Sequence, residues 1–463
     1  MYKKLFYLIF FIIYTFRATS QANTYAIATS NRNNRQRTYS FSEKHPGEAI
    51  SIYRGNTFYF QDANGKPMVL IGYYSWDTFS NVNFDYVRMF DSLKARGLNF
   101  TRVWLWKQYT WDSADRAPNI CPYRREGPGV ANDGKPKYNL DKYDPAFFDR
   151  LKHMCKAAQK RGIYLQLILL DTWMLKHDYL WRLAAFNRDN NINHVDGDPL
   201  NTGTGTDGEH GYCSQGNPQA LKYQKAYIRK VVETVNSYDN IFFEIANENF
   251  YNKQWELALC DFIKKIELEM PKQHMTMRRD FPSHPDFVQS WDPETVHKNI
   301  IAKHNLKVPL IFDTDGMIAK DDNEVRKAAW SAVASGAQFD YLEGGITYLK
   351  DTILRGSGAE VHMQIGYMAR FMKAMEPWTL NSADDLIKNG FAMVMANKNK
   401  LFAYLPKGGA LTLDISGLKG KIKGQWYDPR SGKYSKKFLL YPDKLAKFDA
   451  PDHRDWVLFL RSY

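Results

Sequence analysis

The amino-acid sequence predicts an α/β protein in which a (β/α)8 TIM barrel is followed by a small C-terminal all-β sandwich. Hydrophobic residues make up 44% of the 463 residues and charged residues 24%, a composition that excludes a largely disordered chain. Eight strand–helix steps follow one another over about 310 residues, which matches a (β/α)8 barrel. Beyond Pro377 the pattern changes to short strand-like runs separated by glycines, which is typical of a small sandwich.

The expected barrel strands are short runs that are apolar throughout. Such runs indicate strands buried on both faces, as in a parallel sheet covered by helices. In chain order they are residues 69–74, 100–106, 164–170, 241–246, 274–277, 287–291, 308–312 and 339–342. The fifth and sixth strands are the least distinct, because little helix fits between them. Upstream, Asn64-Gly65 lies between two apolar runs and predicts a β-hairpin.

Amphipathic segments separate most of these strands and predict the helices. They cover residues 84–96, 145–161, 218–236, 253–270, 293–304 and 324–335, and a last helix is expected near 361–375. The long segments 107–143 and 171–217 follow the second and third strands and are expected to wall a cleft. The sandwich strands are expected at residues 391–395, 401–405, 410–415, 422–427 and 456–460.

The N-terminus has the pattern of an export signal over residues 1–20. A basic head precedes an apolar run of twelve residues, which as a helix spans only about 18 Å and is too short for a bilayer. A membrane anchor is the alternative interpretation. Residues 21–45 are polar and are expected to form a flexible leader, followed by the barrel domain at 46–378 and the sandwich at 379–463. The mature protein is expected to be periplasmic or extracellular, with no membrane association after signal removal.

The formal net charge of the chain is +13, and three of these charges lie in the expected signal. No basic helix and no basic run interleaved with aromatic residues is present, so we expect no nucleic-acid partner. An anionic substrate or a negatively charged cell surface explains the excess. The sequence carries no signal for an oligomeric state.

The cysteines and histidines predict neither a metal site nor a redox motif. None of the four cysteines forms a C-x-x-C pair; Cys155 and Cys260 are expected as buried thiols, whereas Cys121 and Cys213 lie in loops and could pair in an exported protein. The histidines show no ligand spacing. Residues 203–208 fit G-x-G-x-x-G, but no strand precedes them directly, so no dinucleotide and no other cofactor is expected.

Polar residues close several of the expected strands, and one charged residue lies inside a strand. Arg102 interrupts the apolar second strand and requires an anion. Asp171 and Trp173 follow the third strand, and Asn247-Glu248 closes the fourth. Because the carboxyl ends of barrel strands meet at one face, these groups are expected to lie close together.

Further carboxylates follow the last two strands. The seventh ends in Asp313-Thr314-Asp315-Gly316, and Glu343 closes the eighth. Cleavage of a glycosidic bond requires one protonated and one ionised carboxyl group. Glu248 suits the proton donor, and Asp315, Asp313 and Glu343 compete for the second role, with Asp315 favoured because it ends the strand.

Asn247-Glu248 after the fourth strand and residues 97–104 around Arg102 resemble the corresponding motifs of clan-A glycoside hydrolases, in particular cellulase-like and apiosidase-like bacterial members. Residues 325–337 resemble the seventh helix and eighth strand of these proteins. The motifs at 402–406, 411–414, 426–432 and 455–458 are similar to the collagen-binding-type β-sandwich that such proteins carry. The resemblance covers roughly residues 52–463.

The resemblance implies a carbohydrate substrate and specific residue roles. Glu248 would be the acid/base, Asn247 would bind the sugar 2-hydroxyl and Arg102 would contact the nucleophile. Most clan members end the seventh strand with Glu, whereas this chain has Asp315, so the pocket geometry must differ. A retaining mechanism is expected, with the inverting one left open, because the choice depends on a carboxyl separation of about 5–5.5 or about 6.5–9.5 Å.

Several of these residues have simpler structural interpretations. Asn247-Glu248 could begin a helix, Arg102 could form a structural ion pair, and Asp171 could cap the turn before Trp173. At least one of the two aspartates beside Gly316 could be a turn former. Trp106 and Trp173, nearest the strand ends, are candidate sugar platforms but could also be core residues. We therefore expect an exported glycoside hydrolase, with a non-catalytic carbohydrate-binding barrel or an adhesion protein that binds through its sandwich as alternatives.

Overall fold

The computed structural model describes residues 49–105, 120–247, 252–282, 290–314, 321–342, 359–441 and 444–463, all of them within one compact unit that spans residues 41–463. The expected signal at 1–20 and the leader at 21–45 lie outside the described residues, as do Trp106, Glu248, Asp315 and Glu343. No helix in the described ranges is long and apolar enough to span a bilayer.

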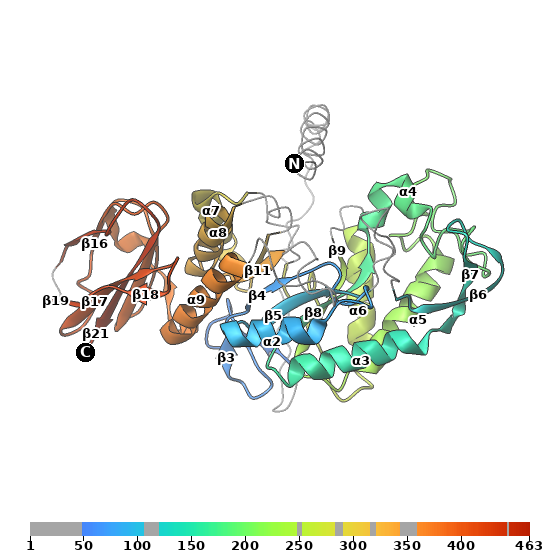
Figure 1. Cartoon of the computed structure of the whole chain (residues 1–463), viewed down its shortest axis with the longest axis horizontal. Helices are drawn as coiled ribbons and strands as arrows, with labels where there is room; N and C mark the ends of the chain where they lie inside the picture. The colour runs from blue at the N-terminus through green and yellow to red at the C-terminus, as the bar shows by residue number, and fades with distance from the viewer. Residues whose placement is uncertain are drawn as a thin grey trace, which may run out of the picture. The chain divides into compact units, whose positions relative to one another are not determined.

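A six-stranded parallel sheet forms the centre of the N-terminal domain (Figure 1). Its strand order is β10 (Ile311–Asp313), β11 (Gln338–Leu342), β4 (Ile71–Tyr74), β5 (Phe100–Trp104), β8 (Tyr164–Asp171) and β9 (Ile241–Asn247). This order places the seventh and eighth expected strands beside the first four. The arrangement is that of a parallel half-barrel, in agreement with the predicted strand sequence.

The fifth expected strand lies beside β9 as an isolated parallel bridge between Phe243 and Thr276. The amide of Phe243 donates to the carbonyl of Met275 at 3.0 Å, and the amide of Met277 donates to the carbonyl of Phe243 at 2.8 Å. Most of the sixth expected strand lies outside the described residues. The described part of the sheet therefore extends by one further short segment on the β9 side.

Helices connect successive strands and cover the outer face of the sheet. They are α2 (Tyr86–Arg96), α3 (Pro145–Gln159), α5 (Pro218–Val235), α6 (Lys253–Glu267), α7 (Pro293–Ile301), α8 (Asp322–Ala334) and α9 (Ala359–Met375). The first six begin at an Asp or Asn whose side chain accepts a first-turn N–H, which is the local reason why they start where they do. These helices agree closely with the predicted segments.

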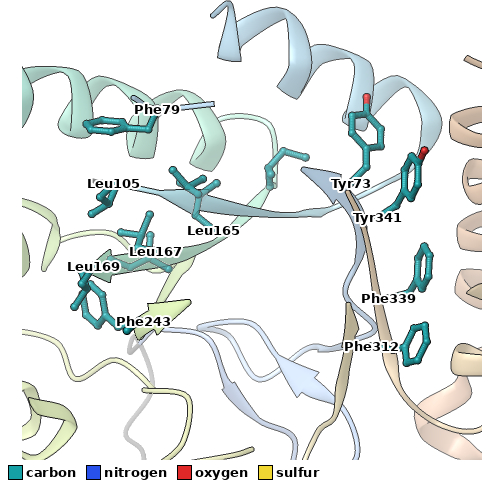
Figure 2. Close-up of a cluster of buried hydrophobic side chains, with 14 of the residues drawn as sticks. Tyr73, Phe79, Leu105, Leu165, Leu167, Leu169, Phe243, Phe312, Phe339 and Tyr341 are labelled. Atoms are coloured by element: carbon teal, nitrogen blue, oxygen red, sulfur yellow. The ribbon is translucent and has the colours of Figure 1, made fainter. Parts of the chain in front are cut away.

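Side chains alternate between the two faces of each barrel strand, because successive residues of a strand point in opposite directions. Leu165, Leu167 and Leu169 of β8 point outward into the main hydrophobic core, as do Phe312 and Phe339 (Figure 2). The intervening residues point into the barrel. At the amino end of the strands the interior is filled by an aromatic stack of Phe60, Phe100, Phe242 and Phe281.

Two hairpins flank the barrel strands. The predicted one around Asn64-Gly65 is confirmed, since β2 (Phe60–Gln61) pairs antiparallel with β3 (Pro67–Met68); Ser51–Ile52 (β1) adds a third strand. The second hairpin, β6 (Tyr123–Val130) with β7 (Pro136–Tyr143), lies inside a segment expected to be a loop. Its register shifts twice, so its sequence lacks the regular alternation that would have revealed it.

The segment that follows β8 is ordered by its own polar side chains. It contains two short helices, η1 (Trp173–Lys176) and α4 (Asp178–Trp181). The amide of Asn191 donates to three backbone carbonyls, and the carboxylate of Asp198 accepts from the backbone N–H groups of Thr202 and Gly203. Asn and Asp side chains replace regular secondary structure here, which gives the segment a defined path.

The C-terminal domain is a two-sheet β structure, as predicted. One sheet contains β12 (Asn381–Ser382), β14 (Met393–Ala396), β15 (Lys400–Leu405), β21 (Trp456–Ser462), β17 (Ile422–Asp428), β18 (Lys433–Tyr434) and β19 (Phe438–Leu440), and the other contains β13 (Ile387–Asn389), β16 (Ala410–Leu413) and β20 (Ala446–Asp449). All pairs in both sheets are antiparallel. Trp426 is buried in the hydrophobic cluster between the two sheets.

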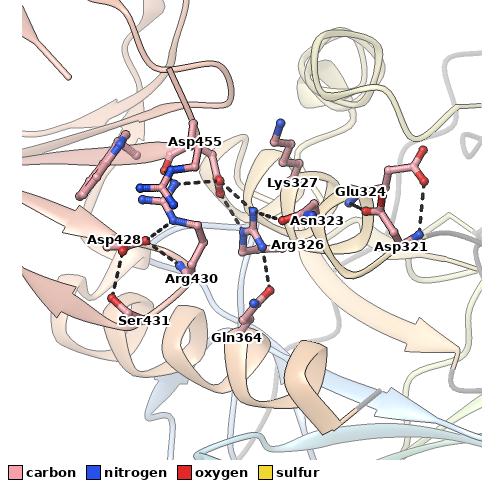
Figure 3. A network of polar contacts seen from close by, with 12 residues as sticks. Asp321, Asn323, Glu324, Arg326, Lys327, Gln364, Asp428, Arg430, Ser431 and Asp455 are labelled. Carbon is pink, nitrogen blue, oxygen red and sulfur yellow. Dashed lines mark hydrogen bonds and ion pairs between the residues drawn. The ribbon is translucent and has the colours of Figure 1, made fainter. Parts of the chain in front are cut away.

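The sandwich packs on the barrel through a buried polar and aromatic interface. Arg326 of α8 forms a two-pronged ion pair with Asp455 through Nε and Nη2 (Figure 3). Nη2 also donates to Asn323, and Nη1 donates to Gln364. Beside it, the ring of Trp330 stacks on Tyr404 with a centroid distance of 5.6 Å. Side chains of β14, β15 and β21 belong to the same hydrophobic cluster as the barrel helices.

Candidate functional site

The interior of the barrel holds a buried polar cluster centred on Arg102 of β5. Its guanidinium pairs with Glu244 of β9 at 3.1 Å and with the carboxylate of Asp313 on β10. The same guanidinium donates to the side-chain oxygen of Asn247 at 2.9 Å. Arg102 therefore joins the second, fourth and seventh strands of the predicted barrel through charge-assisted hydrogen bonds.

Asp313 is fully buried and both of its carboxylate oxygens are engaged. One oxygen pairs with Arg102, and the other accepts from the hydroxyl of Tyr74 at 2.7 Å. The hydroxyl of Tyr74 also lies 3.3 Å from the guanidinium of Arg102. Asp313 thus contributes to the position of Arg102, and its oxygens are committed to neighbouring side chains.

Two further polar residues complete the buried cluster. Gln166 of β8 donates to Glu244 at 2.6 Å. Asp340 of β11 is the register partner of Asp313 and is also fully buried. Burial raises the pKa of Asp340 well above its ordinary value, the charge of Glu244 adds to this effect, and Arg102 opposes it. Burial therefore favours the protonated form of Asp340.

An apolar and aromatic layer lies next to this cluster. Tyr74, Trp104, Ile168 and Leu342 pack together, with Trp76 against them. The guanidinium carbon of Arg102 lies 5.1 Å from the ring centroids of both Tyr74 and Trp104. These rings shield the guanidinium from water, which strengthens its interactions with the carboxylates.

The third strand contributes Asp171 and Trp173 beside the end of β9. Asp171 is the register partner of Asn247, and its carboxylate accepts the backbone N–H of Trp173 at 2.8 Å. The hydroxyl of the intervening Thr172 donates to the carbonyl of Asn247. Trp173 is half-buried, and the ammonium of Lys176 lies 4.0 Å above its ring. One role of Asp171 is thus the turn cap that the sequence allowed.

Of the nine residues that the sequence proposed for the site, the described part contains five. Arg102 is in direct contact with both Asn247 and Asp313. Asp171 lies beside Asn247 in the sheet and accepts a hydrogen bond from the backbone of Trp173. The remaining four follow the last residue of a described strand by one or two positions in the sequence; they are Glu248, Asp315, Glu343 and Trp106. In the described ranges, no group of three or more His, Cys, Asp or Glu side chains is arranged to hold a metal ion.

Four residues of the cluster were not among those proposed from the sequence: Glu244, Gln166, Asp340 and Tyr74. Glu244 carried a signal, since it is a charged residue within the apolar run that forms β9, as Arg102 is within β5. A buried charge requires a partner, so the two could have been paired from the sequence alone. Gln166 and Asp340 gave the same kind of signal, whereas Tyr74 gave none.

The cysteines are all free thiols. Cys155, Cys213 and Cys260 are buried and Cys121 is half-buried. The disulfide considered between Cys121 and Cys213 is absent, and the expected burial of Cys155 and Cys260 is confirmed. Burial raises the pKa of Cys121 to about 12.

Comparisons with known proteins agree with this architecture. Residues 383–461 match the family model described as "Putative collagen-binding domain of a collagenase". No curated protein sequence matches the chain. A solved structure titled "Glycoside hydrolase" is 14% identical with a TM-score of 0.61, covering 91% of this chain and 99% of the other.

A glycoside hydrolase family 5 structure from Bacteroides vulgatus is 16% identical with a TM-score of 0.61, covering 90% of this chain and 93% of that chain. The structural relatives are therefore clan-A glycoside hydrolases, and the likeness extends over most of the chain. The resemblance drawn from the sequence is confirmed for both parts. At this level of identity the likeness establishes the fold, which is a glycosidase-like barrel with an appended sandwich.

Proposed function

We propose that this protein is an exported glycoside hydrolase that cleaves O-glycosidic bonds in a polysaccharide or oligosaccharide by a retaining two-carboxylate mechanism. One observation carries the proposal: Arg102 contacts both Asn247 and Asp313. Asn247 directly precedes Glu248, and Asp313 is two residues before Asp315. Arg102 thus ties together the two strand ends from which the proposed catalytic acids follow.

In this mechanism Glu248 acts first as the general acid and gives its proton to the leaving glycosidic oxygen. Asp315 attacks the anomeric carbon, and the bond to the leaving group breaks as a glycosyl ester forms. Glu248, now ionised, takes a proton from water, which attacks the anomeric carbon and releases Asp315. Two successive inversions give a product of retained configuration.

The residues of the buried cluster would position the groups that carry out this chemistry. Asp313 has both oxygens engaged by Tyr74 and Arg102, so we assign it to positioning rather than to nucleophilic attack. Arg102 would orient Asn247, and Asn247 would contact the sugar. Glu343 remains the alternative to Asp315, while Trp173 and Trp106 are proposed as sugar contacts.

Export is proposed from residues 1–20 and is tested separately from activity. Expression of the full chain in a bacterial host, followed by fractionation and N-terminal sequencing, should place the protein outside the cytoplasm with cleavage near residue 20. Recovery of the uncleaved chain in the membrane fraction would instead support the anchor.

The activity is tested by incubating purified protein with a panel of oligosaccharides and measuring new reducing ends. Glu248→Gln, which preserves side-chain size, should lower the rate at least about a hundredfold, because general acid catalysis contributes this much. An unchanged melting temperature controls for folding. Near-normal turnover by Glu248→Gln would contradict the assignment.

A non-catalytic carbohydrate-binding barrel is the second candidate, and one observation favours it. Asp315 follows the seventh strand by two residues, at the place in the sequence where most clan-A enzymes have Glu, and an aspartate reaches one methylene less far. Under this alternative the protein would bind an oligosaccharide of the panel without releasing reducing ends, and Glu248→Gln would leave binding unchanged.

A further inference from the structure

Positive charge is concentrated in the C-terminal domain. Residues 383–461 contain 15 Lys and Arg against eight Asp and no Glu, a formal net charge of +7, whereas the whole chain carries +13. More than half of the net charge therefore lies in about a sixth of the sequence. An excess of this size on a small domain raises the potential at its surface and attracts anions.

The strand register gathers part of this charge on one face of the larger sheet. Lys423 of β17 lies opposite Arg461 of β21, and Leu439 of β19 lies on the other side of Lys423. Lys421 directly precedes β17, and Tyr463 directly follows β21. The two continue the pairing of these strands, because the backbone N–H of Tyr463 donates to the carbonyl of Lys421 at 3.0 Å. Residues two apart on a strand point to the same face.

Lys398 and Tyr441 lie at the same end of this sheet. Tyr441 follows β19 by one residue, two beyond Leu439, and Lys398 lies in the turn between β14 and β15, two residues before Lys400, the register partner of Arg461. We call the six residues Lys398, Lys421, Lys423, Tyr441, Arg461 and Tyr463 the basic–aromatic strip. Neighbouring strands are about 4.8 Å apart, and each of these residues lies within two positions of an end of β15, β17, β19 or β21, so the six residues gather at one end of the sheet.

The strip is open to solvent and its charges are unbalanced. Tyr441 is 71% exposed and Tyr463 is 58% exposed. Within the described residues none of its four cationic side chains forms an ion pair, and the ammonium of Lys423 lies 3.9 Å above the ring of Tyr463. The neighbouring Lys400 differs, because it pairs with Glu376 at 3.0 Å.

Further along the same strands, this sheet face contacts the barrel. Phe402 of β15 and Tyr427 of β17 belong to the barrel's hydrophobic cluster. The strip is thus the uncovered end of a face whose other end is fixed to the barrel. Exposed aromatic rings lower solubility and unpaired like charges lower stability by repulsion, so a patch that combines them is typical of a binding surface.

We propose that the basic–aromatic strip binds an anionic polysaccharide. Lys and Arg would pair with its carboxylate or sulfate groups, and the two tyrosine rings would pack against the apolar faces of its sugar rings. The choice of a polysaccharide among polyanions rests on the proposed function of the barrel. The strip would hold the chain of a polymer on the enzyme while the barrel acts on it.

The test uses the full-length chain carrying Glu248→Gln, so that binding is measured without hydrolysis. Affinity electrophoresis is run with polygalacturonate, heparin and neutral mannan in the gel. We expect retardation by the anionic polysaccharides but not by mannan, and loss of retardation in 1 M salt, where the screening length is about 3 Å.

Two double variants locate the binding surface. Lys421→Glu/Lys423→Glu should weaken binding at least about tenfold, as should Tyr441→Ala/Tyr463→Ala, which leaves the charge unchanged. The matched control is Lys388→Glu/Lys407→Glu, which makes the same charge change at exposed positions of the same domain away from the strip. Equal weakening by this control, or normal binding by the tyrosine variant, would overturn the proposal.

Further measurements on the same protein test other binding partners and distinguish binding by the strip from activity of the barrel. Stronger retention by double-stranded DNA, collagen or anionic lipid vesicles than by either polysaccharide would overturn the proposal. Hydrolysis of short oligosaccharides by the protein with an intact Glu248 should be unaffected by the strip variants. If the strip does not bind polysaccharide, the proposed function of the barrel still stands. If the strip binds but the barrel is inactive, only the proposed function is contradicted.

Discussion

Arg326 of α8 and Asp455, the residue before β21, form a buried two-pronged ion pair across the boundary between barrel and sandwich. Both nitrogen–oxygen distances are 2.9 Å, and Arg430 of the sandwich adds a hydrogen bond to the carbonyl of Asp455 at 2.9 Å (Figure 3). A buried charge that loses its partner is strongly destabilising. The sequence pattern changes near residue 378, but the buried ion pair shows that the barrel and the sandwich pack directly against each other.

Arg326→Ala should lower the free energy of unfolding by about 3–5 kcal/mol, because it leaves the carboxylate of Asp455 buried with a weakened counter-charge. Urea unfolding followed by tryptophan fluorescence measures the change. Arg454→Ala is the control, since Arg454 pairs with Asp452 at the surface, and its loss should change the stability little. Similar losses for both variants would contradict a special role of the interface.

Deletion of residues 379–463 should give an insoluble or aggregating barrel. Trp330 and Phe371, which pack against Tyr404, Phe402 and Tyr427 of the sandwich, would become exposed. Size-exclusion chromatography of the truncated chain checks this expectation. A monomeric, soluble barrel would show that the sandwich is an independent module, as the adhesion hypothesis requires.

Asp340→Asn should stabilise the protein increasingly as pH rises. Burial raises the pKa of Asp340 in the folded state, so folding favours the protonated form. The wild-type protein then loses stability from the unfolded pKa near 3.9 upward, by about 1.4 kcal/mol per pH unit, until the folded pKa is reached.

The neutral amide introduced by Asp340→Asn does not titrate, so the variant lacks this loss. The difference between variant and wild type, measured by urea unfolding at pH 4, 5, 6 and 7, should therefore grow with pH. Any effect of Asp340→Asn on the packing of its strand neighbours Phe339 and Leu342 should be the same at every pH. A constant difference across these pH values would contradict a raised pKa of Asp340 in the folded state.

Reducing agents should not change the thermal stability, because the described cysteines are free thiols. Burial raises the pKa of the Cys155 and Cys213 thiols, so neither should react with iodoacetamide in the folded protein. Melting curves with and without dithiothreitol and mass spectrometry after alkylation measure both effects. A fall in melting temperature on reduction would indicate a disulfide.

Most of the fold follows from local signals that the sequence states plainly. Mainly apolar runs became β8 and β9, and Asp or Asn caps with Pro at the first turn marked the starts of α3, α5 and α7. The β6–β7 hairpin was missed because its shifted register breaks the alternation on which strand prediction depends.

The candidate site was predicted less completely, since it depends on contacts between distant strands. Arg102 was recognised as needing an anion, but its partner Glu244 lies 142 positions away and was not chosen. The interface was missed for the same reason. Arg326 and Trp330 have the pattern of an ordinary helix face, and only the packed structure shows that the sandwich covers them.

The roles of the two strand-seven aspartates are separable by experiment. Asp313→Asn keeps the size of a side chain that Tyr74 and Arg102 hold in place, but removes the charge that pairs with Arg102. We expect a reduced melting temperature and a moderate loss of kcat/KM. Asp315→Asn should leave the melting temperature unchanged and lower kcat at least about a hundredfold, since it removes the proposed nucleophile.

Sodium azide distinguishes the two variants further, because a small external anion can replace a missing carboxylate nucleophile and give a glycosyl azide. Asp315→Asn should be rescued by azide with inverted product configuration, whereas Asp313→Asn should not. Glu343→Gln serves as the control, with a smaller loss and no rescue. Azide rescue of Glu343→Gln instead of Asp315→Asn would transfer the nucleophile to the eighth strand, and rescue of Asp313→Asn would show that its buried oxygens reach the substrate.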